Sequence, residues 1–378
     1  MHLRSFRERA TRRAGLFEFP DVDVFSSNRL RGVLFPNRLR GESFPPIGNA
    51  AIQGNLEGVR AAMRDQEGSW DEGDFFEGMV HASALGHAEI VQEILNWQAS
   101  ELAGMEPLPH SCSPLVHAAS RGHEDVVRLL LASGVNASEV DFWCWRPGST
   151  ALIEAAGHGY AGIVEGLLST GAHVNFERED GSTALSAAAQ NGHAHVVDIL
   201  LAQCNNTEST RMTLERALRS AVEGNHLDIV IRLLSAGSCC TRCNRTTVCC
   251  AGGASAECSD GDSWRSVGRH GYRVLINLAA ANGTADILRE LVKHGANVNE
   301  LSRGMDNMTP LIIACQKENE DAVRVLIECG ANVSHTRHRR HPYSALLATD
   351  QGSIVRLLLQ AGADPNQVPK PAALNPKP

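Results

Sequence analysis

The sequence predicts an all-α solenoid built from stacked pairs of helices. A phrase recurs with variation from Pro46 to Gly362, and it is clearest as SPLVHAASRGHEDVVRLLLASG, which starts at Ser113. It returns from Ser149, Ser182 and Met308. A repeat period in the low thirties is typical of solenoids, in which each unit contacts only its neighbours. A chain of 378 residues can therefore fold without one large core.

Nine units are expected, six in residues 45–237 and three in residues 271–365. Aligned at the first residue of the first helix, they start at Pro46, Gly78, Pro114, Ala151, Ala184, Arg216, Leu275, Pro310 and Pro342. Successive starts lie 32 to 37 residues apart, except for one spacing of 59 residues. This long spacing predicts an insertion at residues 238–270.

Each unit carries the start and stop signals of two helices. In the Ser113 unit, a hydroxyl followed by Pro114 favours a helix start, because the hydroxyl can accept from free backbone N–H groups and proline suits the first turn. A pair of alanines gives this helix a narrow apolar face, and Gly122 ends it. The second helix carries a broad apolar stripe and ends at Gly134. Neither helix can bury its face alone, so the units must stack.

With TPL, AA, GH, VV, LLL and GANVN in this order, the chain resembles the ankyrin-repeat family over most of its length. The resemblance implies paired antiparallel helices, a β-hairpin finger after each pair, and a concave surface formed by the fingers and the first helices. Some units depart from the pattern. The units at Pro46 and Gly78 lack the TPL start, the Arg216 unit reads RALRSAVEGNHLDIVIRLL, and the last unit has Asp350 where glycine is usual.

The resemblance also implies which residues face a partner. On the concave side, at the ends of the first helices, these are Ser120, Arg121, His158, Gln190, Asn191, Asn282, Gln316 and Lys317. The fingers add Trp143, Trp145, Arg146, Glu179, Asp180, Asp306, Arg337 and His338. The mixed charge of this set favours a polar partner that is recognised by shape.

The finger SEVDFWCWRPGS is unusual because it holds two of the five Trp residues of the chain. Exposed Trp and Arg side chains dominate the binding energy of many interfaces, so Trp143, Trp145 and Arg146 are candidate anchors. The alternative is that the finger folds back and covers an apolar gap between units.

The histidines divide into two groups. His117, His123, His158 and His193 stand at repeat-specific positions, where the resemblance implies hydrogen bonds in or between repeats. The last finger reads HTRHRRHP from His335. Its three arginines would repel a cation, so an acidic partner segment is a better ligand for this basic tip than a metal ion.

The insertion at 238–270 contains six Cys residues, including a C-x-x-C at Cys240 and Cys243. With Cys250 and Cys258, these thiolates can form a tetrahedral zinc site. The spacing fits a standard two-plus-two zinc motif poorly, and the surrounding Gly, Ser and Ala are typical of a linker. A flexible loop is therefore the preferred interpretation, and no cofactor is expected.

The two ends of the chain differ from the repeats in composition. Residues 1–44 hold nine Arg against five acidic residues, although the chain has a net charge of −8. Within this arm, Leu3, Phe6, Ala10, Ala14 and Phe17 share one possible helical face. The arm is either a solvated basic tail or a segment for organelle targeting or membrane-surface binding. Residues 366–378 form a Pro-rich tail.

Composition also restricts location and class of ligand. No apolar run approaches the ~20 residues needed to span a bilayer, and no signal-peptide apolar region opens the sequence. We therefore expect a cytoplasmic or nuclear protein that is monomeric. The acidic body disfavours nucleic acid as a ligand, because nucleic-acid binding requires neutralisation of phosphates.

The sequence shows no phosphate loop, no H-E-x-x-H and no G-x-S-x-G motif, so no enzyme is expected. The prediction is a non-catalytic scaffold or adaptor that binds a partner protein or peptide on the concave surface. One alternative is a substrate-recognition subunit of a ubiquitin-ligase complex, although the short tail shows no recognisable F-box or SOCS-like box. A second alternative is a zinc-binding or nucleic-acid-contacting module that uses the Cys-rich insertion and the basic arm.

Overall fold

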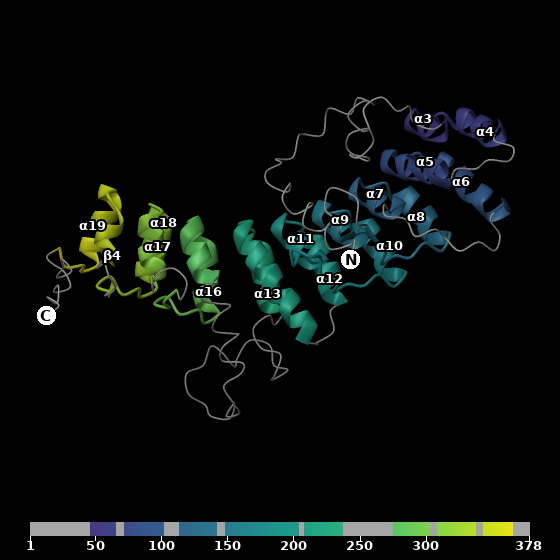
Figure 1. Ribbon diagram of the computed structural model, residues 1–378. Coiled ribbons are helices and arrows are strands. Elements are labelled where there is room, and N and C mark those ends of the chain that lie inside the picture. The colour runs from purple at the N-terminus through teal and green to yellow at the C-terminus, as the bar shows by residue number, and fades with distance from the viewer. Residues whose placement is uncertain are drawn as a thin grey trace, which may run out of the picture.

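The computed structural model describes residues 46–65, 72–101, 113–141, 148–203, 208–236, 275–302, 308–337 and 343–365. The predicted basic arm, Cys-rich insertion and Pro-rich tail lie outside these residues. The described part forms one curved row of helical pairs, which runs from α3 to α19 (Figure 1). The all-α solenoid predicted from the sequence is confirmed.

Each unit contributes a first helix and a second helix to the row. The first helices are α3 (Pro46–Ile52), α5 (Glu72–Leu85), α7 (Pro114–Ser120), α9 (Ala151–His158), α11 (Ala184–Gln190), α13 (Glu208–Glu223), a helix at 275–282, and α17 (Pro310–Gln316). The second helices are α4 (Leu56–Asp65), α6 (Ala88–Glu101), α8 (Glu124–Ala132), α10 (Ala161–Ser169), α12 (Ala194–Ala202), α14 (Leu227–Ser235), α16 (Ala285–Lys293), α18 (Glu320–Glu328) and α19 (Gly352–Gln360).

The predicted helix starts are confirmed where a hydroxyl residue precedes the helix. Thr150 Oγ1 accepts a hydrogen bond from Ile153 N at 3.4 Å, and Thr309 Oγ1 accepts one from Ile312 N at 3.3 Å. At α11, Thr183 and Ser186 satisfy each other's backbone N–H groups in a capping box. These caps satisfy donors that would otherwise be unpaired at the start of a helix.

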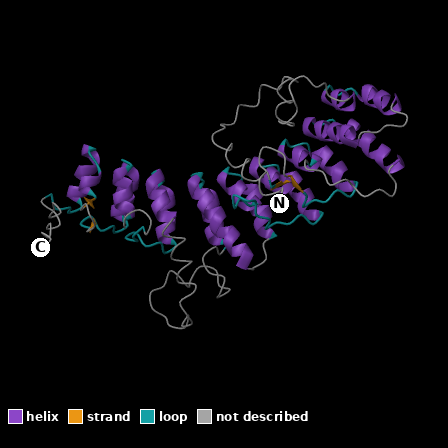
Figure 2. Ribbon diagram, viewed as in Figure 1, coloured by secondary structure: helices purple, strands orange, loops and turns teal. Residues whose placement is uncertain are grey.

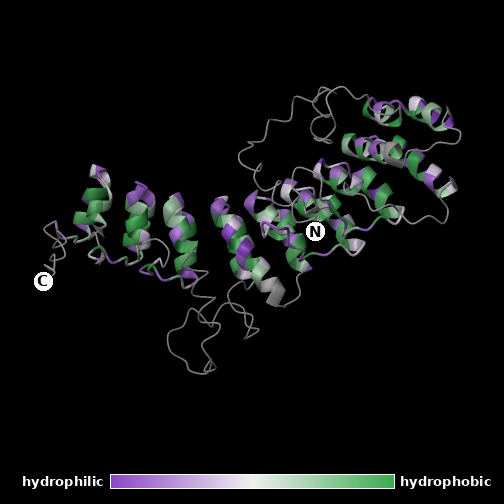
Figure 3. Ribbon diagram, viewed as in Figure 1, coloured by the Kyte–Doolittle hydropathy of each residue, from purple (hydrophilic) through white to green (hydrophobic). Residues whose placement is uncertain are grey.

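The core is a continuous stack of apolar side chains between the helices. Leu130, Leu167 and Leu200 recur at equivalent places in successive second helices, and each is at most 1% exposed. Alanines such as Ala155 and Ala188 are fully buried on the first helices, so these helices approach one another closely. Figure 3 shows the hydrophobic residues distributed along the whole row rather than gathered in one place. This is the distribution expected when every unit depends on its neighbours.

Two first helices begin earlier than predicted. α5 starts six residues before Gly78, and α13 starts eight residues before Arg216. Neither segment contains the Ser/Thr-Pro start, and no glycine or proline stops α13 from extending towards the N-terminus. The alignment at Arg216 is also wrong by one residue, because His226 occupies the place of His193 and lies 33 positions after it. The equivalent of Ala184 is therefore Ala217.

The last unit differs from the others in its first helix. It forms only a short 3₁₀ helix, η1 (Leu346–Ala348), before α19. In the described residues, strands form two fingers: β1 (Val140–Asp141) with β2 (Ser149–Thr150), and β3 (Thr336–Arg337) with β4 (Tyr343–Ser344). Figure 2 shows these two short hairpins in orange. Both are antiparallel, as the hairpin prediction requires.

The turn between the two helices of a unit normally contains a glycine in the left-handed conformation. At Gly159, φ is +79°, and an added Cβ would lie 2.6 Å from Nδ1 of His193 in the next unit. Asn225 and Glu318 take the same turn position with φ of 59° and 57°. In the units that follow these two turns, the position equivalent to His193 is occupied by Thr284 and Gln351, neither of which has an aromatic ring. A side chain is therefore sterically possible at these two turns, but the backbone remains strained.

Replacing Glu318 with glycine is expected to stabilise the protein by about 1 kcal/mol, because relief of left-handed strain exceeds the entropic cost of glycine. The measurement is the thermal melting temperature followed by circular dichroism. Glu318→Ala is the control, since it removes the carboxylate and keeps the strain. An alanine variant as stable as the glycine variant would contradict this explanation.

Candidate protein-binding surface

The first helices lie on the inner side of the curve. First helices of neighbouring units contact one another more extensively than second helices do, as the pairs α11 with α13 and α12 with α14 illustrate. The alanines on their facing sides permit this close approach. A row whose elements are closer on one side must curve towards that side, so the first helices form the concave surface.

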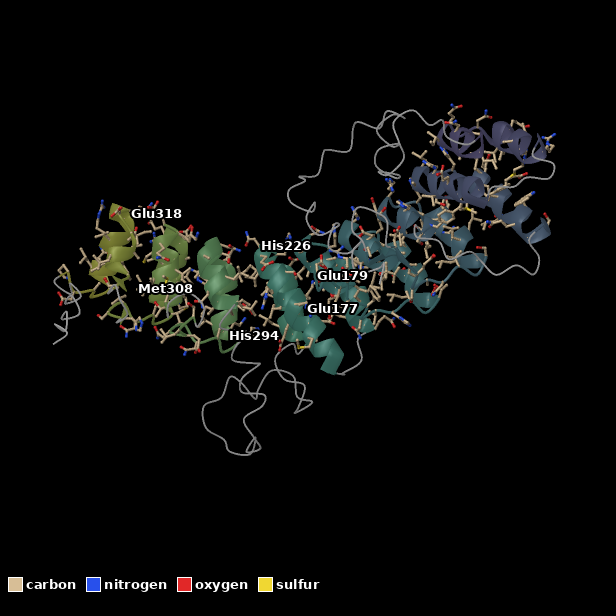
Figure 4. The ribbon with its side chains drawn as sticks, in the orientation of Figure 1. Glu177, Glu179, His226, His294, Met308 and Glu318 are labelled. Carbon is tan, nitrogen blue, oxygen red and sulfur yellow. The ribbon has the colours of Figure 1, made fainter. Side chains whose placement is uncertain are left out.

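The predicted concave residues all lie at the C-terminal ends of first helices or in the turns that follow them. His158, Gln190, Asn191, Asn282, Gln316 and Lys317 are exposed, and Ser120 and Arg121 are half-buried. Because successive units repeat this position, the structure brings these polar side chains into one row. In Figure 4, His226 and Glu318 mark the edge of the row where these turns lie, and His294 lies at the opposite end of the helices.

Some residues of this row also hold the units together. Asn191 Nδ2 donates to the carbonyl oxygen of Gly157 in the preceding unit at 2.7 Å. Asn282 Nδ2 donates to the carbonyl oxygen of Val222 at 3.5 Å. Ser120 Oγ instead bonds within its own helix, where it donates to the carbonyl oxygen of His117 at 2.9 Å. For these three side chains, a partner contact would compete with an existing bond, whereas Gln190 and Lys317 are exposed at the rim.

The repeat-specific histidines form a ladder between units. Nε2 of His123 donates to the carbonyl oxygen of Ala84 at 3.1 Å, and Nε2 of His193 donates to that of Gly157 at 3.1 Å. His226 repeats the contact with Gln190 at 3.0 Å. The structural role predicted for His123 and His193 is confirmed. The role of His226 was not predicted, although the letters GNH at its turn carry the same signal.

Protonation of this ladder should weaken the N-terminal units. His87 occupies the same repeat position in the second unit, and burial lowers its pKa below the usual value. The pKa of His123 is also lowered. Burial is the largest cause, and the charges of Arg121 and His87 act in the same direction, whereas the bond to the carbonyl oxygen of Ala84 opposes them. A histidine with a lowered pKa binds fewer protons when folded than when unfolded, so stability is full above the unfolded pKa of about 6.5 and falls as pH decreases below it.

We expect the melting temperature to fall between pH 7.5 and pH 5.5, and to fall less in a His87→Gln, His123→Gln double variant. The acidic residues are the same in both proteins, so their titration contributes equally to both melting curves and cancels in the comparison. Equal losses in the two proteins would show that these histidines do not contribute to the pH dependence.

A buried polar cluster fixes the base of the aromatic finger. The backbone N–H of Ser113 donates to Asp141 Oδ2 at 3.1 Å, and Ser113 Oγ donates to Glu139 Oε2 at 2.9 Å. Asp141 is fully buried, with Oδ2 3.7 Å from Nε2 of His117. Burial, together with the neighbouring Asp141, raises the pKa of Glu139, although the bond from Ser113 opposes this. Gly148 N closes the finger by donating to the carbonyl oxygen of Asp141 at 2.6 Å.

The candidate anchors Trp143, Trp145 and Arg146 lie outside the described residues. The structure shows where their finger leaves and rejoins the row, at Asp141 and Gly148. Their contribution to binding stays a prediction.

The next finger carries Glu179 and Asp180, which are both exposed. Asp180 accepts from Arg178 Nε at 3.0 Å and from the backbone N–H of Ser182 at 2.8 Å. Burial alone would raise the pKa of Asp180, but these bonds hold it well below the usual range. Arg178 itself is only 9% exposed. Asp180 therefore shapes the finger, and Glu179 is the carboxylate that is free of this arrangement.

The remaining predicted finger residues are only partly within the described structure. Arg337 lies in β3, whereas Asp306 and His338 lie outside the described residues. The candidate zinc ligands Cys240, Cys243, Cys250 and Cys258 also lie outside them. In the described part of the chain, no group of three or more His, Cys, Asp or Glu side chains is arranged to hold a metal ion. No helix in the same part is both long and apolar enough to cross a bilayer.

Comparison with known proteins identifies the repeat. A sequence model described as "Ankyrin repeats (3 copies)" matches residues 78–178, 171–244 and 275–368, which together make up more than half of the chain. This chain belongs to the ankyrin-repeat family. Ankyrin repeats are protein-interaction modules that as a rule have no catalytic activity, so protein partners are expected for this chain.

Two curated proteins from Arabidopsis thaliana match parts of this chain. The E3 ubiquitin-protein ligase KEG is 36% identical over 97 residues, which cover 25% of this chain and 6% of that protein. XBAT35, named as a candidate E3 ubiquitin-protein ligase, is 30% identical over 115 residues, which cover 30% of this chain and 24% of that protein. The chain thus spans only a small part of these relatives.

Among solved structures, the human ASB11 ankyrin repeat domain is 25% identical, with a TM-score of 0.49. The match covers 67% of this chain and 99% of the ASB11 domain.

Proposed function

We propose that this chain is a non-catalytic scaffold or adaptor that binds a partner protein, or an extended segment of one, on its concave surface. The observation that carries the proposal is the row of exposed polar side chains at the ends of the first helices. Three units present these side chains at two adjacent structural positions, with Gln190 and Gln316 at the first, and Asn191, Asn282 and Lys317 at the second. A partner that lies along the row can contact several units at once.

The contacts between units favour binding by a preformed surface. The His123, His193 and His226 bonds tie each turn to the preceding unit, and Asn319 Nδ2 repeats the contact by donating to the carbonyl oxygen of Ala281 at 2.7 Å. A rigid surface loses little conformational entropy when a partner docks, so more of the contact energy appears as affinity.

The proposal is tested by affinity capture from a native extract followed by quantitative mass spectrometry. A Gln190→Glu, Lys317→Glu double variant alters two exposed sites on the concave side. We expect it to reduce specific capture by about tenfold or more, which corresponds to about 1.4 kcal/mol. Normal helicity and melting temperature establish that both proteins are folded.

The matched control is Gln203→Glu with Arg356→Glu, which makes the same change of net charge at exposed positions of second-helix segments. This control should capture the partner as well as the unchanged protein does. Equal loss of partner capture in both variants would indicate a non-specific charge effect. If neither variant lost capture, the concave surface would not be the binding site. A further Trp143→Ala, Trp145→Ala variant tests the aromatic finger separately.

A second candidate function is substrate recognition within a ubiquitin-ligase complex. It is favoured by the similarity to KEG and XBAT35, whose names describe ligases. In such a complex, these repeats would bind the protein that is to be modified. Co-purification of a cullin or another ligase component with the intact chain would support this role, and its absence from a capture that recovers other partners would oppose it.

A further inference from the structure

A shallow groove crosses the second helices of the first three units, on the side away from the concave surface. Its volume is about 460 Å³. Leu56 of α4, Ala88 of α6 and Leu129 of α8 line it with apolar atoms, and all three side chains are half-buried. The polar residues along it are Arg60, Glu89, Gln92 and Glu93. The groove is open to solvent rather than enclosed, so it suits a segment laid across its surface.

The groove lies between second helices, which from α4 to α14 contact one another less than the first helices do. α4 and α6 contact each other less than the first helices α3 and α5 do, and Ala88 is too small to fill the space. Arg60 crosses from α4 to α6, with Nε and Nη2 each 3.0 Å from a carboxylate oxygen of Glu93. At the next step, a Cβ added at Gly162 of α10 would lie 2.9 Å from Glu124 Oε2, so a side chain of α8 lies against α10 at that point.

The surroundings of the groove are acidic. The described side chains of α4, α6 and α8 include the carboxylates of Glu57, Glu89, Glu93, Glu124 and Asp125. The basic residues on the same helices are Arg60, Arg64 and Arg128, which leaves a net charge of −2 against these five carboxylates. Arg60 pairs with Glu57 and Glu93, and Arg128 pairs with Glu124 and Asp125, so Glu89 is the carboxylate outside these pairs. Glu89 is exposed at the groove. A segment whose apolar side chains are flanked by arginines would match both the apolar lining and the negative charge of the groove.

This chain itself contains such a segment. Residues 3–17 carry Leu3, Phe6, Ala10, Ala14 and Phe17 at a spacing that puts them on one face of a helix. Five of the nine arginines in residues 1–44 lie within the same segment, beside a single Glu. The stretch that follows leads directly to Pro46, which begins α3 and thus the unit that forms one wall of the groove.

We propose that residues 3–17 bind in the groove between α4, α6 and α8 of the same chain. Phe6 and Phe17 would cover Leu56, Ala88 and Leu129, and the arginines would lie beside the carboxylates on the rim. This is the helix-in-groove mode of peptide recognition. The residues between Phe17 and Pro46 can span about 3.3 Å each, so the link easily reaches the groove. The intramolecular link raises the effective concentration of the segment at this site.

Photo-crosslinking in the intact chain tests this proposal. Benzoylphenylalanine is placed at Gln92, at the groove, and in a second protein at Glu165, the equivalent fifth residue of α10. Peptide mapping of the monomeric product should recover residues 1–19 attached to position 92. We expect about tenfold less of this product from position 165, because the tethered segment would meet that site only in passing.

Three variants make the test specific. Phe6→Ser with Phe17→Ser lies outside the described helices and should abolish the crosslink while leaving the repeats folded. Glu89→Arg, at an exposed site, should reduce it, and raising the salt concentration from about 0.05 M to 0.5 M should do the same, since screening weakens exposed charge pairs. Equal crosslinking at both positions, attachment to any other segment, or attachment to a second copy of the chain would overturn the proposal.

Discussion

Gly159→Ala is expected to destabilise the repeat array by about 3 kcal/mol, because two independent costs add at this position. The first is the left-handed backbone, with φ at +79°. The second is the contact of the new Cβ with His193, whose Nδ1 would lie only 2.6 Å away. Movement of the ring would also break the 3.1 Å bond from His193 to Gly157, which joins units four and five.

Gly171 provides a matched control in the same unit. It has φ of +90°, but no atom lies within 4 Å of an added Cβ. Gly171→Ala should therefore cost only the backbone strain, about 1 kcal/mol. The measurement is the midpoint of urea unfolding for the two variants and the unchanged protein.

A double-mutant cycle isolates the contact itself. In a His193→Ala background, the cost of Gly159→Ala should fall to about that of Gly171→Ala, because the ring that the Cβ meets is gone. If Gly159→Ala and Gly171→Ala are equally destabilising in the original background, close packing of the histidine on the glycine is not what joins these units.

The second large effect is expected at Leu200, which is fully buried in α12 between two neighbouring units. Leu200→Ala should destabilise the protein by about 3 kcal/mol, because it removes buried apolar surface and leaves a cavity in a stack that has no other core to compensate. The adjacent Leu201 is only half-buried, so Leu201→Ala should cost about 1 kcal/mol.

Urea unfolding and hydrogen exchange measure this effect together. Exchange should increase most in α12 and in the neighbouring helices α10 and α14, since a solenoid passes instability to its nearest units. A uniform increase across all described helices would indicate a single cooperative core instead. Equal effects of the two leucine substitutions would contradict the assignment of the core.

The features that the sequence predicts well are those set by short-range signals. Thr150, Thr183 and Thr309 cap helices as expected, because a hydroxyl before an apolar run acts on backbone donors within three residues. The location of the polar row at the ends of the first helices is also local, since it follows from adjacent positions that recur in several units, whereas the contact of this row with a partner stays a prediction.

The features that were missed depend on contacts between units. α13 extends to Glu208, and its Arg216 forms an ion pair of 2.8 Å with Glu177 on the preceding finger. No spacing in the sequence indicates that pair. The bonds of Asp180 to Arg178 and Ser182 are an exception, because they are local to one finger; the repeat pattern does not mark them, and Asp180 was predicted only as a partner-binding residue. The groove at Ala88 depends on how far neighbouring helices are spread, which no local pattern encodes.

The central claim is that a partner protein binds along the concave ends of the first helices. Its most direct test is hydrogen exchange of the intact chain with and without the captured partner. We expect protection at the ends of α9, α11 and α17, around His158, Gln190 and Gln316, with no change in the second helices α10, α12 and α18. Protection confined to the second helices would contradict the claim and place the partner on the opposite face.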